Sequence, residues 1–317
     1  MIITKQSFPG TAATTIQVQD SSPPTTSPPI SLLSEDKDDE GEDQSFPPTT
    51  SSLPATTEFT SCFDTEDGGR YGVLYNAVRS YVDLDCANNQ ECDIGQTYGW
   101  PMKSWCVRNV KDMSYLFEGM NTFNEDISDW NTSNVTNMAY MFAGATSFDQ
   151  DLSNFDTSSV TNMNSMFSGA QSFNGDLSNF NTSSVTDTSW MFFGAKSFDQ
   201  DLTNFEISSV TNMDRMFRSA TSFNGNVSNF DTSRVTDMFH MFYGATSFNQ
   251  DVSSFNLSSV TVSFMFSGAS SFNQNLCSWR DSFPYFKARQ IFFESGCTYE
   301  NTPSEAQKGP FCASDCQ

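Results

Sequence analysis

Apolar side chains recur along most of this chain in a fixed rhythm, with a period of 25 residues. The clearest marker is the valine that opens each unit, at Val110, Val135, Val160, Val185, Val210, Val235 and Val260. The last unit departs slightly, because one residue is missing between Val260 and Met265. A strict period in this range is typical of proteins that stack one structural unit on the next. The pattern therefore predicts a repeat solenoid of seven units over residues 110–279.

Within one unit, the apolar spacing changes from that of a helix to that of an extended segment. The first half places apolar residues at the spacing of one helix face, at Val160, Met163, Met166, Phe167 and Ala170. Ser158 or Ser159 can cap such a helix, and Gly169 lies where it would end. The stretch 176–180 suits a brief strand. We therefore expect a short helix plus a short strand or extended rung in every unit.

Three columns of aromatic residues occupy matching positions in successive units. They are Phe117, Phe142, Phe167, Phe192, Phe217, Phe242 and Phe266; Phe123, Phe148, Phe173, Phe198, Phe223, Phe248 and Phe272; and Trp130, Phe155, Phe180, Phe205, Phe230, Phe255 and Trp279. These columns contain 19 of the 31 phenylalanines, so they account for most of the aromatic richness. Stacked units bury such faces in series. We predict that these aromatics form the core and are not a binding site.

The regions on either side of the strict repeat differ from it in composition. Residues 1–60 are rich in Ser, Thr, Pro and acidic side chains, which predicts a disordered segment. Residues 61–109 are expected to form an N-terminal cap, with a short helix at 71–82 and a partial first rung at 98–109. Residues 280–317 are expected to form a C-terminal cysteine-bearing cap and tail.

Eight cysteines lie only at the two ends of the repeat. They are Cys62, Cys86, Cys92 and Cys106 before it, and Cys277, Cys297, Cys312 and Cys316 at its close or after it. Even numbers confined to the ends predict disulfide-stapled caps in an oxidising compartment, although the sequence leaves three pairings open within each group. A zinc site at Cys312 and Cys316 is the alternative, but no second close pair completes it.

The charge of the chain limits the classes of partner. It carries 15 basic against 38 acidic residues, a net charge of −23. A nucleic-acid partner is therefore excluded, because phosphate binding needs clustered Lys and Arg. No apolar stretch is long enough to span a membrane. No signal peptide is visible either, so an exported protein would imply a truncated N-terminus.

A column of aspartates is the sharpest hint of a metal site. It consists of Asp126, Asp151, Asp176, Asp201 and Asp251, each at the same position of its unit. Stacked carboxylates repel one another, so something must offset the repulsion. Hydrogen bonds from the N–H groups of the turn would do so. The alternative is calcium between the rungs, and no other cofactor is indicated.

One position of the unit varies widely and is the best candidate for ligand recognition. It holds Tyr115, Tyr140, Trp190, Arg215 and His240, which we expect to be exposed helix positions. His240 is the only histidine, so a site that needs two histidines is excluded, and no phosphate-binding glycine motif occurs. We predict that the protein is not an enzyme.

The unit as a whole resembles a known family. The motif VTNMxxMFxGAxSFNxDLSxF, present at 160–180 and with one or two changes at 135–155 and 235–255, is similar to that of BspA-like leucine-rich-repeat surface proteins, in the branch with a repeat of roughly 25 residues. This resemblance implies a leucine-rich-repeat-like solenoid displayed outside the cell. It also implies adhesion or protein binding without a catalytic site.

Together these features predict an extracellular or cell-surface binding scaffold. One face of the solenoid would be presented to an extracellular protein or glycan partner. The alternative is a structural protein of a cell wall or matrix, linked through cations.

Overall fold

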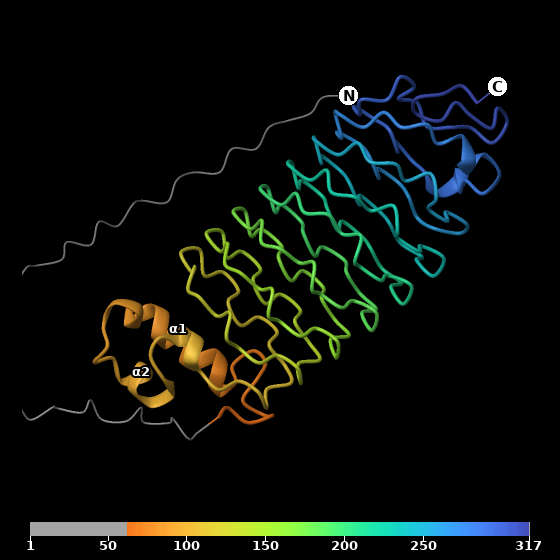
Figure 1. The fold of residues 1–317 in the computed structure, drawn as a ribbon. Coiled ribbons are helices and arrows are strands. Elements are labelled where there is room, and N and C mark those ends of the chain that lie inside the picture. The colour runs from red at the N-terminus through yellow and green to blue at the C-terminus, as the bar shows by residue number, and fades with distance from the viewer. Residues whose placement is uncertain (1–61, 317) are drawn as a thin grey trace, which may run out of the picture. The chain divides into compact units, whose positions relative to one another are not determined.

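Each repeat unit folds into one coil, and successive coils lie side by side in a computed structural model of the protein (Figure 1). The structure describes residues 62–316, so the prediction for residues 1–60 lies outside the described part. Neighbouring coils are joined by parallel β-bridges between matching positions: Asp112–Asn137, Asn137–Asn162, Asn162–Asp187, Asp187–Asn212, Asn212–Asp237 and Asp237–Thr261. The period of the sequence is therefore also the spacing of contacts between coils.

Backbone N–H groups at the start of each unit are divided between two kinds of acceptor. The N–H groups of Ser165 and Phe167 donate to carbonyls of the next coil, at 2.9 Å each. The N–H groups of Met166 and Ser168, which alternate with them, donate to carbonyls three residues back in the same coil, at 3.2 and 3.1 Å. Half of these donors are thus satisfied only when a second coil is present, so a single unit lacks acceptors for them.

The short helix expected at the start of each unit is wrong. Residues 110–276 contain no helix and no strand longer than an isolated bridge. Ser165 and Gly169 have φ of 56° and 71°, which is left-handed backbone, and equivalent residues recur in the other units. Left-handed residues four apart are incompatible with a right-handed helix. The chain turns instead, and it still directs the same apolar side chains inward.

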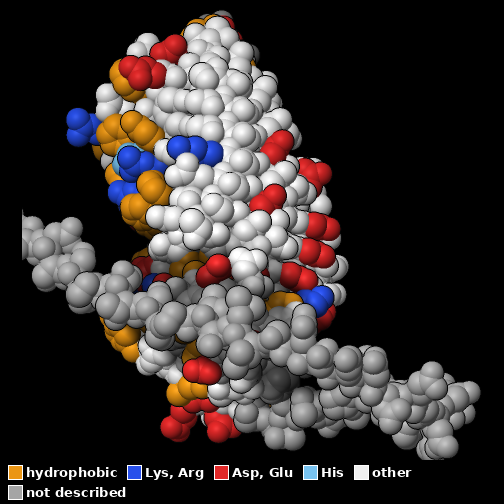
Figure 2. Space-filling view, turned by 90° about the vertical axis from the view of Figure 1, so that its left-hand side faces the viewer, with side chains coloured by type: hydrophobic (Ala, Val, Ile, Leu, Met, Phe, Trp, Pro, Cys, Tyr) orange, Lys and Arg blue, Asp and Glu red, His pale blue; other side chains and the backbone are white. Residues whose placement is uncertain are grey.

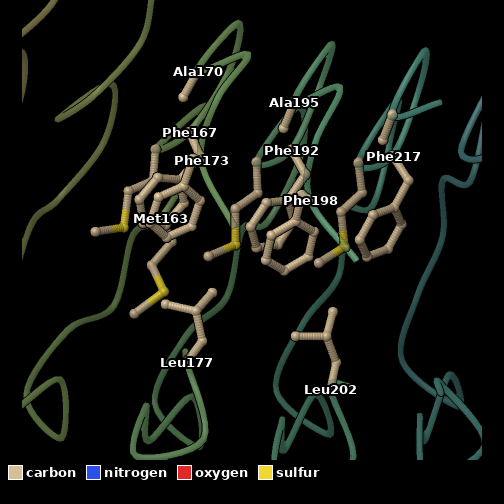
Figure 3. Packing of buried hydrophobic residues seen from close by; sticks show 14 of the residues in the cluster. Met163, Phe167, Ala170, Phe173, Leu177, Phe192, Ala195, Phe198, Leu202 and Phe217 are labelled. Atoms are coloured by element: carbon tan, nitrogen blue, oxygen red, sulfur yellow. The ribbon is translucent and has the colours of Figure 1, made fainter. Parts of the chain in front are cut away.

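The aromatic columns form the core, as the sequence predicts. The Phe167 ring lies 5.5 Å from that of Phe142 in the previous coil and 5.6 Å from that of Phe192 in the next. Within its own coil, it stacks on Phe173 at 4.1 Å. Figure 3 shows these pairs repeating from coil to coil above the leucines Leu177 and Leu202. All of these side chains are buried.

A buried column of threonines supports the polar corner of the coil. Thr132, Thr157 and Thr182 are nearly fully buried, and their hydroxyls donate to carbonyls of the next coil at 3.1, 3.0 and 3.0 Å. Ile207 and Leu257 take the same position in two later units and are also buried. The position therefore accepts either a hydrogen-bonded threonine or a larger apolar side chain.

Two helices precede the first coil. Helix α1 spans Val73–Asp83, close to the range expected from the sequence, and α2 spans Asp93–Tyr98. Short 3₁₀ helices follow each of them, at Cys86–Asn88 and Met102–Ser104. The Trp105 ring then stacks on that of Trp130 at 6.5 Å, one period later. The helical part thereby covers the aromatic end of the coil stack.

The stack continues past the last strict repeat. After 3₁₀ helices at Cys277–Asp281 and Tyr285–Lys287, the chain forms another coil edge. Phe264 and Phe266 donate their N–H groups to the carbonyls of Arg289 and Ile291, at 2.8 and 2.9 Å. Phe292 is buried against Phe266 at 6.0 Å. This coil closes the C-terminal end of the core.

Disulfides join the cysteines within each terminal group. The pairs are Cys62–Cys106, Cys86–Cys92, Cys277–Cys316 and Cys297–Cys312. No cysteine in the described chain is free. The zinc alternative at Cys312 and Cys316 is therefore wrong, because each of these sulfurs is bonded to a different partner.

Candidate functional site

The aspartate column lies on the surface, and its carboxylates take part in turns. The side chains of the column are exposed, and four of them accept a hydrogen bond from the N–H two residues ahead: Asp126 from Ser128, Asp151 from Ser153, Asp176 from Ser178 and Asp251 from Ser253, at 2.8–2.9 Å. Asp201 instead accepts from the N–H of Asn226 in the next coil, at 2.8 Å. The first four are turn hydrogen bonds of the kind that the sequence analysis expects, whereas the fifth joins neighbouring coils.

The first aspartate of the column, Asp126, also forms an ion pair with a lysine side chain. Lys103 Nζ lies 3.3 Å from the Asp126 carboxylate. Hydrogen bonds from Ser128, and then the contact with Lys103, hold the pKa of Asp126 below its usual value. Among the described residues, no three Asp, Glu, His or Cys side chains come close enough together to hold a metal ion. The column therefore does not gather three carboxylates at one point.

The variable column falls into two groups. Tyr115 and Tyr140 stack on each other with ring centres 4.7 Å apart. Ser165, which is 3% exposed, follows them and separates them from Trp190, Arg215 and His240. The expectation that this column is exposed and helical is wrong: all of these residues have φ near 60°, and the five candidate residues are half-buried. Left-handed backbone turns each side chain towards its neighbours in the column.

Two further positions of the unit face the same surface and were missed. One lies three residues after the variable column and holds Phe193, Arg218 and Tyr243 in successive coils. The other immediately precedes the column and holds Phe239 beside His240. Both correspond to unspecified letters of the repeat motif, in MxxMF and MFxGA, so their variability was visible in the sequence. Three of the six unspecified letters of the motif thus lie on one face.

Two arginines of a single coil lie between aromatic rings of the flanking coils. The Arg215 guanidinium carbon is 4.7 Å from the ring centre of Trp190 and 4.9 Å from that of Phe239. The Arg218 guanidinium carbon is 5.8 Å from Phe193 and 4.8 Å from Tyr243. A ring face attracts a cation at such distances, so both guanidiniums are held on two sides.

These contacts extend over five coils into one continuous surface. We call it the aromatic–arginine patch, and it comprises Trp190, Phe193, Arg215, Arg218, Phe239, His240, Tyr243, Phe264 and Arg289. Figure 2 shows apolar and basic side chains gathered around the single histidine, while acidic side chains run along the opposite edge of the view. The remainder of that face is mostly uncharged polar surface.

The charges of the patch are unevenly paired. Arg215 is bonded to the carboxylate of Asp214, whose pKa burial raises even though Arg215 opposes that shift. Neither Arg218 nor Arg289 forms an ion pair with any described residue. Burial, with Arg218 and Arg215, lowers the pKa of His240 to about 4. At neutral pH the patch therefore carries positive charge from arginine alone.

Three nitrogens of the patch are buried without a hydrogen-bond partner. They are Nε of Arg215, Nε of Arg218 and Nδ1 of His240. Buried polar atoms of this kind are usually satisfied in folded proteins. Their grouping in one place distinguishes this face from the regular coil surface.

The described helices include none with the length and apolarity needed to cross a bilayer.

Comparison with known proteins adds a family. A family model described as "Mycoplasma protein of unknown function, DUF285" matches residues 89–205 and, again, residues 191–301. The two matches overlap and together cover more than half of the chain. No curated protein and no solved structure shows significant similarity to the chain.

Proposed function

Because the chain belongs to the DUF285 family, a repeat family of the kind that includes BspA-like surface proteins, we propose that it is an extracellular or cell-surface binding scaffold. In this proposal the stacked coils are a leucine-rich-repeat-like solenoid of the BspA-like branch with the 25-residue motif. The scaffold presents one face to an extracellular protein or glycan, in adhesion, and carries no catalytic site.

The observation that carries this proposal is that three neighbouring variable positions of the motif together form the aromatic–arginine patch. Positions that stack coil on coil hold nearly the same residue in every unit, as the phenylalanine columns do. Positions on the patch change from unit to unit, and they change to Trp, Tyr, Phe and Arg. These residue types dominate binding energy at protein surfaces. Contacts between these rings and guanidiniums also stabilise the stack, but Asn164, Ser165 and Ser168 hold the same positions in another coil, so stacking does not require them.

The disulfides support an extracellular location. Four bridges lie at the two ends of the repeat, and structural disulfides are typical of oxidising compartments outside the cytosol. Titration of thiols in the native, unreduced protein tests this part directly. We expect no reactive thiol, whereas eight free thiols would contradict export. Protease accessibility of the protein on intact cells supplies the second readout of location.

Binding is tested with the full chain and a variant that keeps the coil intact. Serine already occupies the patch positions in the unit that begins at Val160, as Ser165 and Ser168. The triple variant Trp190→Ser, Arg218→Ser and Tyr243→Ser therefore copies a natural coil. We expect wild type to bind saturably to at least one member of a panel of immobilised extracellular proteins and glycans, and the triple variant to lose that binding.

A matched control changes the aspartate column, which lies outside the patch. Asp151→Asn, Asp176→Asn and Asp251→Asn place at these positions the residue that Asn226 already provides. This control should bind as wild type does. Calcium-dependent self-assembly without binding to any panel member would favour the alternative, a structural protein of a wall or matrix.

A further inference from the structure

We infer that the aromatic–arginine patch binds a protein segment in which carboxylate side chains stand beside apolar ones. This inference rests on the proposed binding function and selects one class of partner for it.

The composition of the patch is that of a protein–protein interface. Protein interfaces are enriched in Trp, Tyr, Phe and Arg and depleted in Ser, Lys, Asp and Glu relative to other surface. The patch contains six aromatic or imidazole rings and three arginines, and no lysine. In the unit beginning at Val160, the same positions hold Asn164, Ser165 and Ser168. At these positions the coils of the patch carry residues typical of interfaces, whereas the coil that begins at Val160 carries neutral polar ones.

Arg218 is positioned to receive a carboxylate. Its guanidinium is held between Phe193 and Tyr243, and the residue remains partly exposed. No described carboxylate pairs with it, although the chain has 38 acidic residues. Arg215, three residues earlier in the same coil, differs because it already forms an ion pair with Asp214. A guanidinium fixed in a plane pairs with a carboxylate through two parallel hydrogen bonds.

Arg289 supplies a second such cation at the far end of the patch. Its guanidinium carbon lies 6.0 Å from the ring centre of Phe264, and it too has no ion pair within the described chain. Phe264 in turn contacts His240 and Phe239. Two unpaired cations therefore flank an apolar centre. A partner with acidic residues on either side of apolar ones matches this order.

The shape of the patch and the use of its rings argue against a glycan. Small ligands bind mainly in concave sites, and none of the best-formed pockets of the described chain is lined by a residue of the patch. Sugar rings stack on free aromatic faces, but guanidiniums already lie over Trp190, Phe239 and Tyr243. A protein surface needs neither a hollow nor a free ring face.

The inference is tested by selection from a phage-displayed library of random linear peptides on the immobilised full chain. We expect the selected peptides to carry Asp or Glu beside aromatic or aliphatic residues, and their binding to weaken as salt rises. The double variant Arg218→Ser and Arg289→Ser should bind the selected synthetic peptides about tenfold more weakly or worse, as is typical of a central arginine. Both changes copy residues found at these positions in other coils, Ser168 and Ser263.

The control for lost charge is Arg234→Ser. Arg234 is exposed, lies outside the patch and occupies a position that is serine in four other units, so the variant should bind as wild type does. Arg218→Lys keeps the charge without the planar fork and should bind with intermediate strength. Unchanged melting temperatures would show that all variants fold.

Each other outcome counts against the inference. Selected peptides without acidic residues, or peptides that bind the double variant equally well, would overturn it. So would binding of an anionic polysaccharide, such as hyaluronan or heparin, that is lost in the double variant, although the binding-scaffold proposal would then stand. If neither the peptide library nor the polysaccharides gives binding that depends on the patch, the assignment of the binding face to the patch fails as well.

Discussion

The guanidinium of Arg218 lies over the ring of Tyr243, with its central carbon 4.8 Å from the ring centre. Tyr243 holds in its coil the position that Arg218 holds in the preceding one, so the stacking of coils creates this contact. Phe193 occupies the same position one coil earlier and meets the other side of the guanidinium. An arginine fixed in this way loses little further freedom on binding. The repeat thus preorganises a charged group by the same register that aligns the core.

The buried aromatic columns should contribute most of the free energy of unfolding. Phe167→Ala removes a fully buried ring that stacks on Phe142, Phe173 and Phe192. We expect a loss of about 3–5 kcal/mol in the free energy of unfolding, as for other buried aromatics. Phe167→Leu refills most of the volume and should cost about half as much or less. Urea denaturation followed by circular dichroism measures both, and equal effects would argue against the ring stacking.

Left-handed backbone should decide the effect of exchanging Gly and Ser at one position. Gly169 has φ of 71°, and Ser219 occupies the equivalent position with φ of 58°. Gly169→Ser should lower the free energy of unfolding by about 1–2 kcal/mol, because non-glycine residues are strained there. Ser219→Gly should raise it, by up to about 1 kcal/mol after the added entropy of the unfolded chain. Opposite signs in thermal melts are the expected result; changes of one sign would show that packing, not φ, controls the site.

The aspartates of the column should stabilise the protein through hydrogen bonds within their turns, and not through a bound cation. Asp176→Ala removes the acceptor for the Ser178 N–H and should cost about 0.5–1.5 kcal/mol. Asp176→Asn keeps an acceptor, as Asn226 does for Ser228 at 2.9 Å, and should leave stability nearly unchanged. Melting temperatures in chelator and in excess calcium should coincide. A clear rise with calcium that Asp176→Asn abolishes would restore the cation interpretation.

His240 should make stability depend on pH in a defined window. Its pKa falls from an ordinary 6.5 to about 4 in the fold, because burial, Arg218 and Arg215 all oppose its protonation. Between these values the unfolded state binds more protons, so the contribution of His240 is complete above pH 6.5 and is lost as pH falls towards 4. His240→Ser should therefore show a smaller fall in melting temperature over this window. Parallel curves for the two proteins would contradict the assigned shift.

The C-terminal disulfides should hold the last coil in place. Cys297 and Cys312 are buried, and their bridge closes a loop with a sequence separation of 15. Replacing both with Ser should cost about 3 kcal/mol on the loop-entropy scale. Hydrogen exchange should rise first in residues 287–297. As a control, Cys86→Ser with Cys92→Ser removes a bridge with a separation of only 6 at the other end, and it should leave that exchange unchanged.

The buried columns could be predicted from the sequence because they depend only on which residues recur. Phe167, Phe173 and Phe180 recur at a fixed spacing, and stacking buries whatever recurs. The local backbone could not be predicted in this way. The residues at 163, 166, 167 and 170 suit one helix face, yet the N–H groups of Ser165 and Phe167 have acceptors in the next coil. That alternative exists only once coils are adjacent, so a single unit read alone favours the wrong structure.

The candidate site was predictable in part. The variable column identified Trp190, Arg215 and His240, because variation against an even background is visible without a structure. Arg218 was overlooked although its motif position varies as much. Arg289 lies beyond the strict repeat, where the spacing changes, and only the hydrogen bond from Phe264 to its carbonyl places it in line with the others. Contacts between rings and guanidiniums likewise follow from the left-handed turn, which the sequence pattern did not reveal.

Since Ser165 alone separates the tyrosine pair from the patch, the coil that begins at Val160 acts as a spacer. Gene rearrangement can remove or duplicate whole units of this kind, because every coil offers its neighbours the same hydrogen-bond register. Loss of residues 160–184 would place Tyr140 next to Trp190 and fuse the two groups into one aromatic stripe. The order of units therefore sets which side chains lie together on this face, while the core stays the same.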